Sequence, residues 1–595
     1  MFQWSRNAPR FFNLTILYQR RPFLTSISVM QASTLNRPVQ KGDTEHQNRK
    51  RPFHAARGAK RQRTKKEKPV EEGSHQEVLL ADVRALFAAS NLSDSPGQIS
   101  LRSLDKKEDP DAATPAEDEV EGHGLPEPFT EIEVKVVEIS STGDGLARHG
   151  SSNQIYVVPF TAPGDTVMVK VIKHFEKEHY SLTDFISVVE PSHLRDDTRI
   201  NCKYFSTCSG CQFQMLDYPT QLQHKKKIVE KAYKNFSQLP PELVPVIQDT
   251  IGSPLQYGYR TKLTPHFDGP PGFLSKAAKQ GGAKKTFDKV PEIGFMQKGM
   301  RKTLDIEDCP IGTDAVRMGM KRERVRVAEE LTKYQKGATI LLRESTRRVP
   351  NSDEGASQSP QDTVKCVAAT YTDFKTCITD NNATSTEYID DFVFTSIAGS
   401  FFQNNNSILP NFTQYIRDHI LPPASTSTST QPEIKYLIDA YSGSGLFTIT
   451  LSSLFTSSIG IDVSSASITS ARQNATLNKL SPSQCKFIDA DAAELFKSVK
   501  FPSDETVVVL DPPRKGCDES FLRQLLKFRP RRVVYVSCNV HTQARDVGVL
   551  VRGMEDGETR YSIESLRGFD FFPQTGHVEG VAVLNRVDSV AEGRS

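Results

Sequence analysis

The stretch Val533-Val534-Tyr535-Val536-Ser537-Cys538-Asn539 decides the fold. It is an unbroken run of β-branched and aromatic residues that passes directly into polar residues. Strands of a parallel sheet look like this, because both of their faces are covered. Ligands of such sheets bind beyond the carboxyl ends of the strands, which is where Cys538 falls. A free cysteine is also a common small core residue, so the thiol alone leaves both interpretations open.

Four earlier segments repeat this pattern of a strand followed by polar residues. They are Tyr436–Tyr441, which leads into Ser442-Gly443-Ser444-Gly445, then Ser458–Ile461 before Asp462, then Cys485–Asp491 with acids at its tip, and Thr506–Leu510 before Asp511. Helical segments separate the strands, so the sequence predicts an α/β fold with a Rossmann-like sheet. One edge of that sheet would then be a cleft lined by polar residues.

The Gly-rich turn and the acid after the second strand indicate the kind of cofactor. Thr448 stands where a dinucleotide-binding loop has its third glycine, which argues against NAD and for a nucleoside cofactor without a pyrophosphate. Asp462 is placed to accept hydrogen bonds from ribose hydroxyls. Alternatively, Asp462 or Ser464 caps the next helix.

Residues 129–189 have a different pattern of short alternating strands. The runs Glu131–Val136, Gln154–Pro159 and Thr166–Val171 are separated by Gly- and Pro-containing turns, which predicts a small antiparallel barrel. Gly143-Asp144-Gly145-Leu146-Ala147 and Phe160-Thr161-Ala162-Pro163-Gly164-Asp165 resemble the TRAM domain of RNA-modifying enzymes. A barrel without a ligand has the same strands, so the strands alone do not establish RNA binding.

A cysteine cluster follows the barrel. Cys202, Cys208 and Cys211 lie within ten positions, and Cys309 follows far downstream. Four thiolates can hold an iron–sulfur cluster or a structural zinc ion. Nine cysteines without a secretory signal do not suggest a disulfide framework, so we expect these thiols to be free for metal or catalysis.

The first 124 residues are expected to form a disordered extension with targeting signals. Residues 1–40 are Arg-rich and free of acids, which fits a mitochondrial transit peptide or a basic tail. Lys60–Lys68 fits a nuclear-import signal or an arm that binds phosphates. Ala81–Ala89 is predicted to be a short helix. The net charge is +3, and no apolar run is long enough to span a membrane.

Three motifs together resemble the RNA uracil-C5 methyltransferase family of the bacterial TrmA and RumA type. They are Asp511-Pro512-Pro513-Arg514-Lys515-Gly516, Val536-Ser537-Cys538-Asn539 and Thr575-Gly576-His577-Val578-Glu579. The resemblance runs from about Phe129 to the C-terminus, and the overall arrangement is similar to that of fungal members that act on tRNA. It implies a class I S-adenosylmethionine-dependent methyltransferase domain, and some members carry a [4Fe–4S] cluster on four matching cysteines.

The resemblance also assigns roles by position. Cys538 would be the nucleophile and Glu579 the base, while Gln403, Tyr441, Asp462 and Asp511 would form the cofactor site. Cys202, Cys208, Cys211 and Cys309 would be the metal ligands. The family often has Glu at the position of Asp462, Cys at Ser442 and Asn at Leu446.

The chemistry explains why such residues are needed. A thiolate that adds to C6 of uracil makes C5 nucleophilic, and a carboxylate must later remove the C5 proton. His577 competes with Glu579 for the second role, and Arg514, Lys515 or Arg545 would lower the thiol pKa. The target uridine must be flipped out of its stack. Phe569, Phe571 and Phe572 would stack on bases or, as we expect, fill the core.

The sequence therefore predicts four regions: residues 1–124, a TRAM-like barrel at 125–190, a central domain at 191–395, and the methyltransferase domain at 396–595. We expect a monomeric enzyme that makes 5-methyluridine in the T loop of tRNA, located in mitochondria or in the nucleus and cytoplasm. Alternatives are a ribosomal RNA substrate, a cytosine-C5 methyltransferase, and an RNA-binding or chaperone protein without catalysis. Ser537 argues against the cytosine enzymes, which prefer Pro before the cysteine.

Overall fold

The computed structural model describes residues 70–93, 124–150, 152–270, 286–352, 362–423, 432–490, 496, 499–554 and 559–587. The transit-like residues 1–40 and the basic run Lys60–Lys68 lie outside these ranges. No helix in the described ranges has the length and apolar character needed to cross a bilayer.

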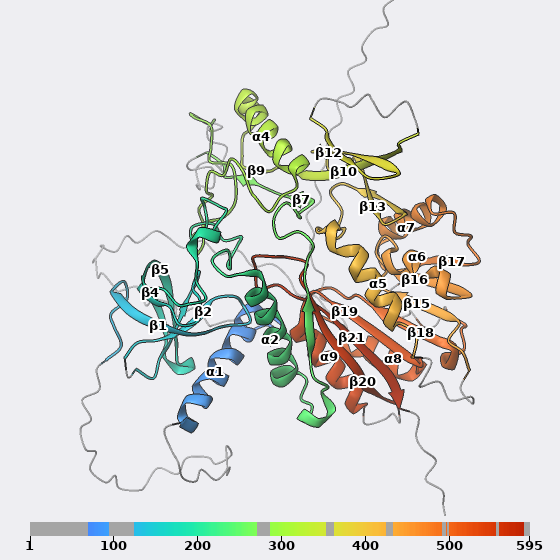
Figure 1. Cartoon of the computed structure of the whole chain (residues 1–595), viewed down its shortest axis with the longest axis horizontal. Helices are drawn as coiled ribbons and strands as arrows, with labels where there is room; N and C mark the ends of the chain where they lie inside the picture. Colours follow the sequence, from blue (N-terminus) through green and yellow to red (C-terminus); the bar gives the residue numbers. More distant parts are fainter. Residues whose placement is uncertain are drawn as a thin grey trace, which may run out of the picture. The chain divides into compact units, whose positions relative to one another are not determined.

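An eight-stranded sheet carries the C-terminal half of the chain (Figure 1). Its order is β17-β16-β15-β18-β19-β21-β20-β6. The strands are β6 (Gln248–Ile251), β15 (Tyr436–Ala440), β16 (Ser457–Asp462), β17 (Cys485–Asp489), β18 (Thr506–Leu510), β19 (Arg532–Ser537), β20 (Arg560–Phe569) and β21 (Glu579–Val587). β15 to β19 are parallel, and β21 runs antiparallel to both β19 and β20. The Rossmann-like α/β fold and its five successive strands are thereby confirmed.

Alternate residues of these strands are buried against helices on the two faces of the sheet. Val533 and Tyr535 belong to a core shared with α2 (Tyr218–Phe236), α8 (Glu519–Phe528) and α9 (Val540–Arg552). Val534 and Val536 belong to a second core on the opposite face. The helices of that second core are α5 (Leu409–His419), α6 (Leu446–Thr450) and α7 (Ser465–Leu477). Double coverage explains the unbroken apolar run in the sequence.

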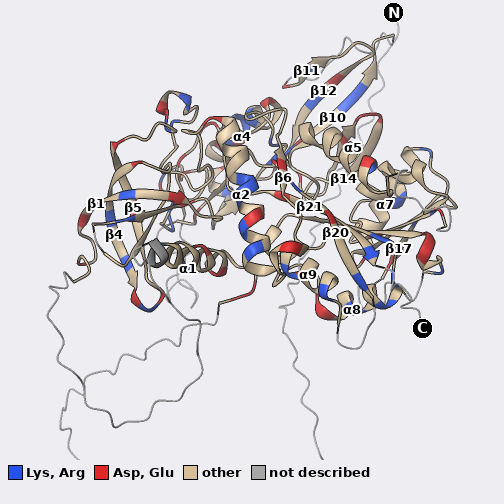
Figure 2. Ribbon diagram, turned by 60° about the horizontal axis from the view of Figure 1, so that its bottom comes forward, with Lys and Arg blue, Asp and Glu red and all other residues tan. Residues whose placement is uncertain are grey.

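The predicted barrel is present and closed, with strand order β1-β2-β3-β5-β4, but it is not antiparallel throughout, because β3 and β5 pair in parallel. Its strands are β1 (Glu131–Ile139), β2 (Gly145–Arg148), β3 (Ile155–Val158), β4 (Thr166–Phe175) and β5 (Tyr180–Glu190). Alternate residues of β1 and β4 fill its interior. Both signs of charge occur on β1 and on α2, whereas β4 carries lysines and β5 carries acidic residues (Figure 2).

Helix α1 (His75–Ser93) corrects the expectation that residues 1–124 lie outside the fold. Leu79, Leu80 and Val83 are buried against the barrel residues Leu146 and Val157. The predicted short helix at 81–89 is therefore the middle of a longer one. It docks because its apolar residues recur at helical spacing and cover an apolar outer face of the barrel.

The central region contains α4 (Asp314–Glu329) and small sheets. Its strands are β7 (Lys262–Leu263), β8 (His266–Phe267), β9 (Ala338–Thr339), β10 (Leu342–Pro350), β11 (Val364–Val367), β12 (Tyr371–Ile378), β13 (Thr384–Ile389) and β14 (Phe392–Ile397). The polar stretch from Glu344 reads in the sequence as a surface insertion, but as far as Pro350 it is β10, paired with β7 and β12. The domain boundaries at 190/191 and 395/396 stay predictions.

Candidate active site

The parallel strands end at one edge, and four of the predicted site residues follow them there. Tyr441 comes after β15, Asp462 closes β16, Asp511 comes after β18, and Cys538 comes after β19. The sheet order places β15 beside both β16 and β18, and β18 beside β19. Neighbouring strand ends thus carry the cofactor candidates and the thiol along a single edge, as the sequence predicts.

Cys538 is half-buried between β19 and α9, whose N-cap is Asn539. Burial raises the pKa of the thiol to about 12, and the negative charges of Glu579 and Asp511 add to the increase. Arg514 opposes them, because its positive charge lowers the pKa of the thiol. Of the three cations that the sequence offers, Arg514 is therefore the one that stabilises the thiolate.

Arg545, the second of these cations, serves a different group. Its guanidinium pairs with the buried Asp546 at 2.8 Å and with Glu72 at 2.9 Å. Asp546 also accepts hydrogen bonds from the Cys517 amide and the Tyr535 hydroxyl. Arg545 and Asp546 thus hold the loop that follows Asp511 against α9.

Glu579 is the first residue of β21, and it comes directly before Gly580, the partner of Ser537 in the β19–β21 ladder. The ladder pairs Ser537 of β19 with Gly580 of β21, so its continuation leads to Cys538 and Glu579. Burial raises the pKa of Glu579 well above the usual range, Asp511 adds to this shift, and Arg514 counteracts it. A carboxylate with a raised pKa is a stronger base once it is ionised.

His577, the other candidate base, lies two positions before Glu579. The residue is exposed by surface area, yet enough protein surrounds its ring to lower the pKa to about 4, with Arg514 and Lys225 adding to the effect. The ring stacks edge-on with Phe572 at 5.8 Å. A group with so low a pKa is a weak proton acceptor, which favours Glu579 as the base.

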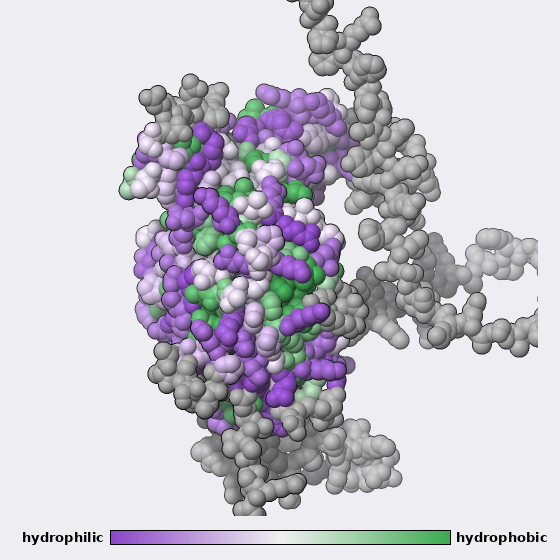
Figure 3. Space-filling view, turned by 90° about the vertical axis from the view of Figure 1, so that its right-hand side faces the viewer, coloured by the Kyte–Doolittle hydropathy of each residue, from purple (hydrophilic) through white to green (hydrophobic). Residues whose placement is uncertain are grey.

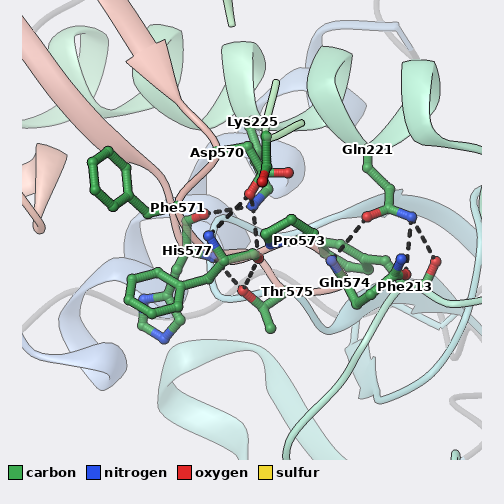
Figure 4. A network of polar contacts seen from close by, with 12 residues as sticks. Phe213, Gln221, Lys225, Asp570, Phe571, Pro573, Gln574, Thr575 and His577 are labelled. Carbon is green, nitrogen blue, oxygen red and sulfur yellow. Dashed lines mark hydrogen bonds and ion pairs between the residues drawn. The ribbon is translucent and has the colours of Figure 1, made fainter. Parts of the chain in front are cut away.

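Residues 570–578, which lead into Glu579, are held by helix α2 (Figure 4). Lys225, which is fully buried, donates to Asp570 Oδ1 at 2.5 Å, to the Phe572 carbonyl at 3.1 Å and to the His577 carbonyl at 2.7 Å. Gln221 exchanges hydrogen bonds with the backbone amide and the side chain of Gln574. These contacts fix the segment that leads to the candidate base, Glu579, from a part of the chain that the sequence motifs do not include.

Two of the three phenylalanines near the base are core residues, as expected. Phe569 and Phe571 are buried and pack edge-on against Phe412. Phe572 is half-buried, and the guanidinium of Arg260 lies 5.4 Å from its ring centre. Only Phe572 of the three has surface available for a base.

The Gly-rich turn is built around two carboxylates. Asp439, buried within β15, accepts hydrogen bonds from the amide and the hydroxyl of Thr448 at 2.9 and 2.6 Å. Asp462 accepts from the amides of Gly443 at 3.0 Å and Ser464 at 2.7 Å. Ser464 rather than Asp462 is the N-cap of α7. A carboxylate has about four acceptor positions, so Asp462 keeps capacity for two ribose hydroxyls.

The other cofactor candidates differ in how well the structure defines them. Tyr441 is half-buried, with its ring 5.3 Å from Phe521. Burial raises the pKa of Asp511 to about 7, with Asp439 adding to the shift. Gln403 is half-buried in the link between β14 and α5. Its neighbour Asn405 donates to the Phe571 carbonyl at 3.1 Å, which ties this link to the segment that carries the base.

Apolar side chains are also exposed around this edge. Val463, directly after Asp462, is 70% exposed, and Phe401 is 74% exposed. Figure 3, which views the side of α7 and β17, shows apolar surface between polar areas. The sequence analysis predicts no role for either residue, although an apolar residue directly after Asp462 could contact the flat face of a nucleobase.

The four predicted metal ligands lie in one region, but they are not close enough together to coordinate a metal ion. Burial raises the pKa of Cys211 to about 12, and the thiols of Cys309, Cys202 and Cys208 add to the increase. Cys309, likewise buried, is influenced by Cys202 and Cys208. Within the described ranges, however, no three His, Cys, Asp or Glu side chains are grouped closely enough to hold a metal ion.

Comparisons with known proteins agree with this geometry. A family model described as tRNA (Uracil-5-)-methyltransferase matches residues 382–587, and a TRAM domain model matches residues 127–177. The tRNA (uracil(54)-C(5))-methyltransferase of Schizosaccharomyces pombe is 42% identical over 533 residues, which is 90% of this chain and 87% of that protein. The enzyme of the same name from Saccharomyces cerevisiae is 42% identical over 486 residues, or 76% and 73% of the two chains.

A solved structure has the same fold. It is the Pyrococcus abyssi tRNA (uracil-54, C5)-methyltransferase in complex with S-adenosyl-L-homocysteine, which aligns with a TM-score of 0.52 at 24% identity over 76% of this chain and 100% of that one. The fold and site thus define an S-adenosylmethionine-dependent methyltransferase with an N-terminal TRAM barrel. The chain belongs to the tRNA (uracil-5-)-methyltransferase family.

Proposed function

We propose that this enzyme methylates C5 of uridine 54 in the T loop of tRNA through a covalent bond between Cys538 and C6 of the uracil. The observation that carries the proposal is the position of Cys538 and Glu579, which directly follow the last pair of the β19–β21 ladder, Ser537–Gly580, with the positive charge of Arg514 acting on the thiol. S-adenosylmethionine supplies an electrophilic methyl group, and Tyr441, Asp462, Asp511 and Gln403 are the residues proposed to hold it.

The residues of the chain account for each proton and electron pair. Cys538 adds as a thiolate to C6, and the C5=C6 π electrons shift to C5 and the C4 carbonyl oxygen. The resulting enolate makes C5 the nucleophile. Arg514 stabilises the thiolate before addition. After C5 has taken the methyl group, Glu579 removes the C5 proton, the C5=C6 bond re-forms, and the sulfur leaves as a thiolate.

A mechanism-based trap tests the proposal. In tRNA made with 5-fluorouridine, fluorine replaces the C5 proton, so Glu579 has no proton to remove and the adduct persists. We expect a denaturation-resistant complex that needs S-adenosylmethionine and maps to Cys538. Its formation with a Cys538→Ala variant, or its absence from the wild-type protein, would overturn the mechanism.

The same trap separates the RNA substrates. Transcripts with uridine 54 changed to cytidine should form no complex, and a ribosomal RNA fragment should form none either. A complex with the ribosomal fragment alone would favour the rRNA alternative. RNA binding with no adduct on any transcript would favour a non-catalytic RNA-binding protein.

We also propose that Cys202, Cys208, Cys211 and Cys309 bind a [4Fe–4S] cluster. Four thiols in one region are the required donor set, and a bound metal would have to draw them closer together. Anaerobic purification should give about four iron atoms per chain and absorption near 400 nm for a [4Fe–4S] cluster. Zinc without iron would instead support the structural alternative, and neither metal would exclude both.

For location and assembly, we propose a monomer directed to mitochondria, or to the nucleus and cytoplasm, by residues 1–40 and Lys60–Lys68. Fluorescent fusions with and without each segment test the destinations. Light scattering on the purified protein tests the monomer, with a mass of 66.4 kDa expected.

A further inference from the structure

Residues 71–74, immediately before α1, lie against the turn behind Cys538. Asn539 Nδ2 donates to the Gly73 carbonyl at 3.1 Å, and Arg545 of α9 pairs with Glu72 at 2.9 Å. A Cβ atom on Gly73 would stand 2.3 Å from Thr542 Cγ2, and the φ of Gly73 is +66°. The contact is therefore close enough to require glycine, both sterically and conformationally.

Asn539 also contacts the turn after β18, which contains Arg514. The same side-chain amide donates to the Arg514 carbonyl at 3.0 Å, and the Thr542 hydroxyl donates to it at 3.1 Å. Arg514 is the cation whose charge lowers the pKa of the Cys538 thiol. The side-chain amide of Asn539, the residue after Cys538, thus bonds both the Gly73 carbonyl and the Arg514 carbonyl.

Hydrogen bonds connect residues 73 and 74 to the first turn of α1. Ser74 Oγ accepts from the Glu77 amide at 3.3 Å, and Glu77 accepts from the Gly73 amide at 2.6 Å, an arrangement close to a capping box. Farther along α1, Asp82 accepts from the Ser141 amide of the barrel at 2.5 Å. Residues 71–74 also lie outside both ranges that the family models match.

We propose that residues 71–74 are a strap that positions the Cys538 turn from the barrel side. The strap fixes the Asn539 amide, which holds Arg514 and Cys538 in the geometry for addition to C6. This proposal rests on the proposed function, because the effect of the strap is measured as a rate of methyl transfer. It is a positioning role and involves no contact between the strap and the substrate.

Gly73→Ala in the full chain is the direct test. A displacement of the reacting groups by about 1 Å can cost about 100-fold in rate, so we expect kcat to fall at least about tenfold while the KM values for tRNA and S-adenosylmethionine change by less than about twofold. Gly258→Ala is the matched control: its φ is +64° and a Cβ there would meet nothing within 4 Å. It carries the same backbone strain without the collision.

A second substitution provides a rescue. Thr542→Ser keeps the hydroxyl that bonds the Arg514 carbonyl and removes the Cγ2 methyl that the new Cβ at position 73 would strike. We expect the Gly73→Ala, Thr542→Ser double variant to return to within about threefold of Thr542→Ser alone, because only the strain of the positive φ remains.

The outcomes separate the strap from the proposed function. If the wild-type protein transfers no methyl group to tRNA, the proposed function is wrong. An active wild type, with Gly73→Ala no slower than Gly258→Ala or with no recovery in the double variant, would sink only the strap. If Gly73→Ala does not fold, Glu72→Arg takes its place, since Glu72 is exposed and reversal of its charge repels Arg545. An unchanged kcat in that variant would overturn the strap as well.

Discussion

Cys538 and Glu579 occupy the next position of the antiparallel ladder after the pair Ser537–Gly580. The proposed nucleophile and base are thus placed by the backbone of a sheet whose central strands are buried on both faces. Strand spacing is nearly invariant in sheets, so the ladder fixes the two strand ends from which these residues extend. This arrangement makes the roles of the two residues separable by substitution.

Glu579→Gln should stop the reaction after methyl transfer rather than before it. The amide cannot accept the C5 proton, so Cys538 cannot leave, and a covalent complex with natural tRNA should accumulate. Gel electrophoresis under denaturing conditions measures the complex, and nuclease digestion should show that its uracil is methylated. A variant that turns over at the wild-type rate would contradict the role of Glu579, as would one that forms no complex although it folds.

Alkylation of Cys538 should depend steeply on pH. The pKa of its thiol is raised to about 12, so the thiolate fraction, and with it the rate of reaction with iodoacetamide, should rise about tenfold per pH unit between pH 7 and 10. Arg514→Met should slow alkylation at a given pH, because loss of the positive charge raises the thiol pKa further. Mass spectrometry of the Cys538 peptide, with exposed Cys366 as the reagent reference, measures the rates. A plateau near pH 8.5 would contradict the prediction.

Asp462→Ala should weaken the cofactor. Loss of hydrogen bonds to an ionised group costs about 1.5–3 kcal/mol, which corresponds to a KM for S-adenosylmethionine about 10–100 times higher. We expect little change in the KM for tRNA. Asp462→Glu is the matched control and should retain most of the affinity, since the family often has Glu there. Equal KM values for the two variants would show that the carboxylate does not bind the cofactor.

Lys225→Met should destabilise the fold strongly. It leaves Asp570 buried without its cation, and the removal of one partner from a buried ion pair costs about 3–5 kcal/mol. Urea unfolding measures the loss. Lys226→Met on the same helix is the control, because Lys226 pairs with an exposed Asp249 and should change little. A double variant, Lys225→Met with Asp570→Leu, should regain part of the stability, and equal stabilities for Lys225→Met and Lys226→Met would contradict the prediction.

The sequence predicts the sheet well because each strand is a short apolar run that stops at a polar residue. The same pattern located Tyr441, Asp462, Asp511 and Cys538 at one edge. Lys225 could not be found in this way, since it lies 345 residues from Asp570 and only the fold brings them together. A lone Lys in a charged helix segment reads as solvated, and nothing local marks it as buried.

The two errors in the fold have a common physical cause. Residues Glu344–Thr363, which include most of β10, and helix α1 are both surrounded by polar residues in the sequence, a pattern that predicts a surface insertion and a disordered extension. In β10 the polar residues are satisfied by partners distant in sequence: Arg343 pairs with Glu387, and Arg348 pairs with Asp373. In α1 a few apolar residues are enough, because the barrel supplies the complementary surface.

The position of β21 has a consequence for protein synthesis. This strand follows both β19 and β20 in the chain, yet it inserts between them in the sheet and brings Glu579 with it. A nascent chain therefore contains the proposed nucleophile before it contains the proposed base. Because β21 is also the strand that joins β19 to β20, the base and the completed sheet arrive together, and the two reactive groups become neighbours only when the sheet closes.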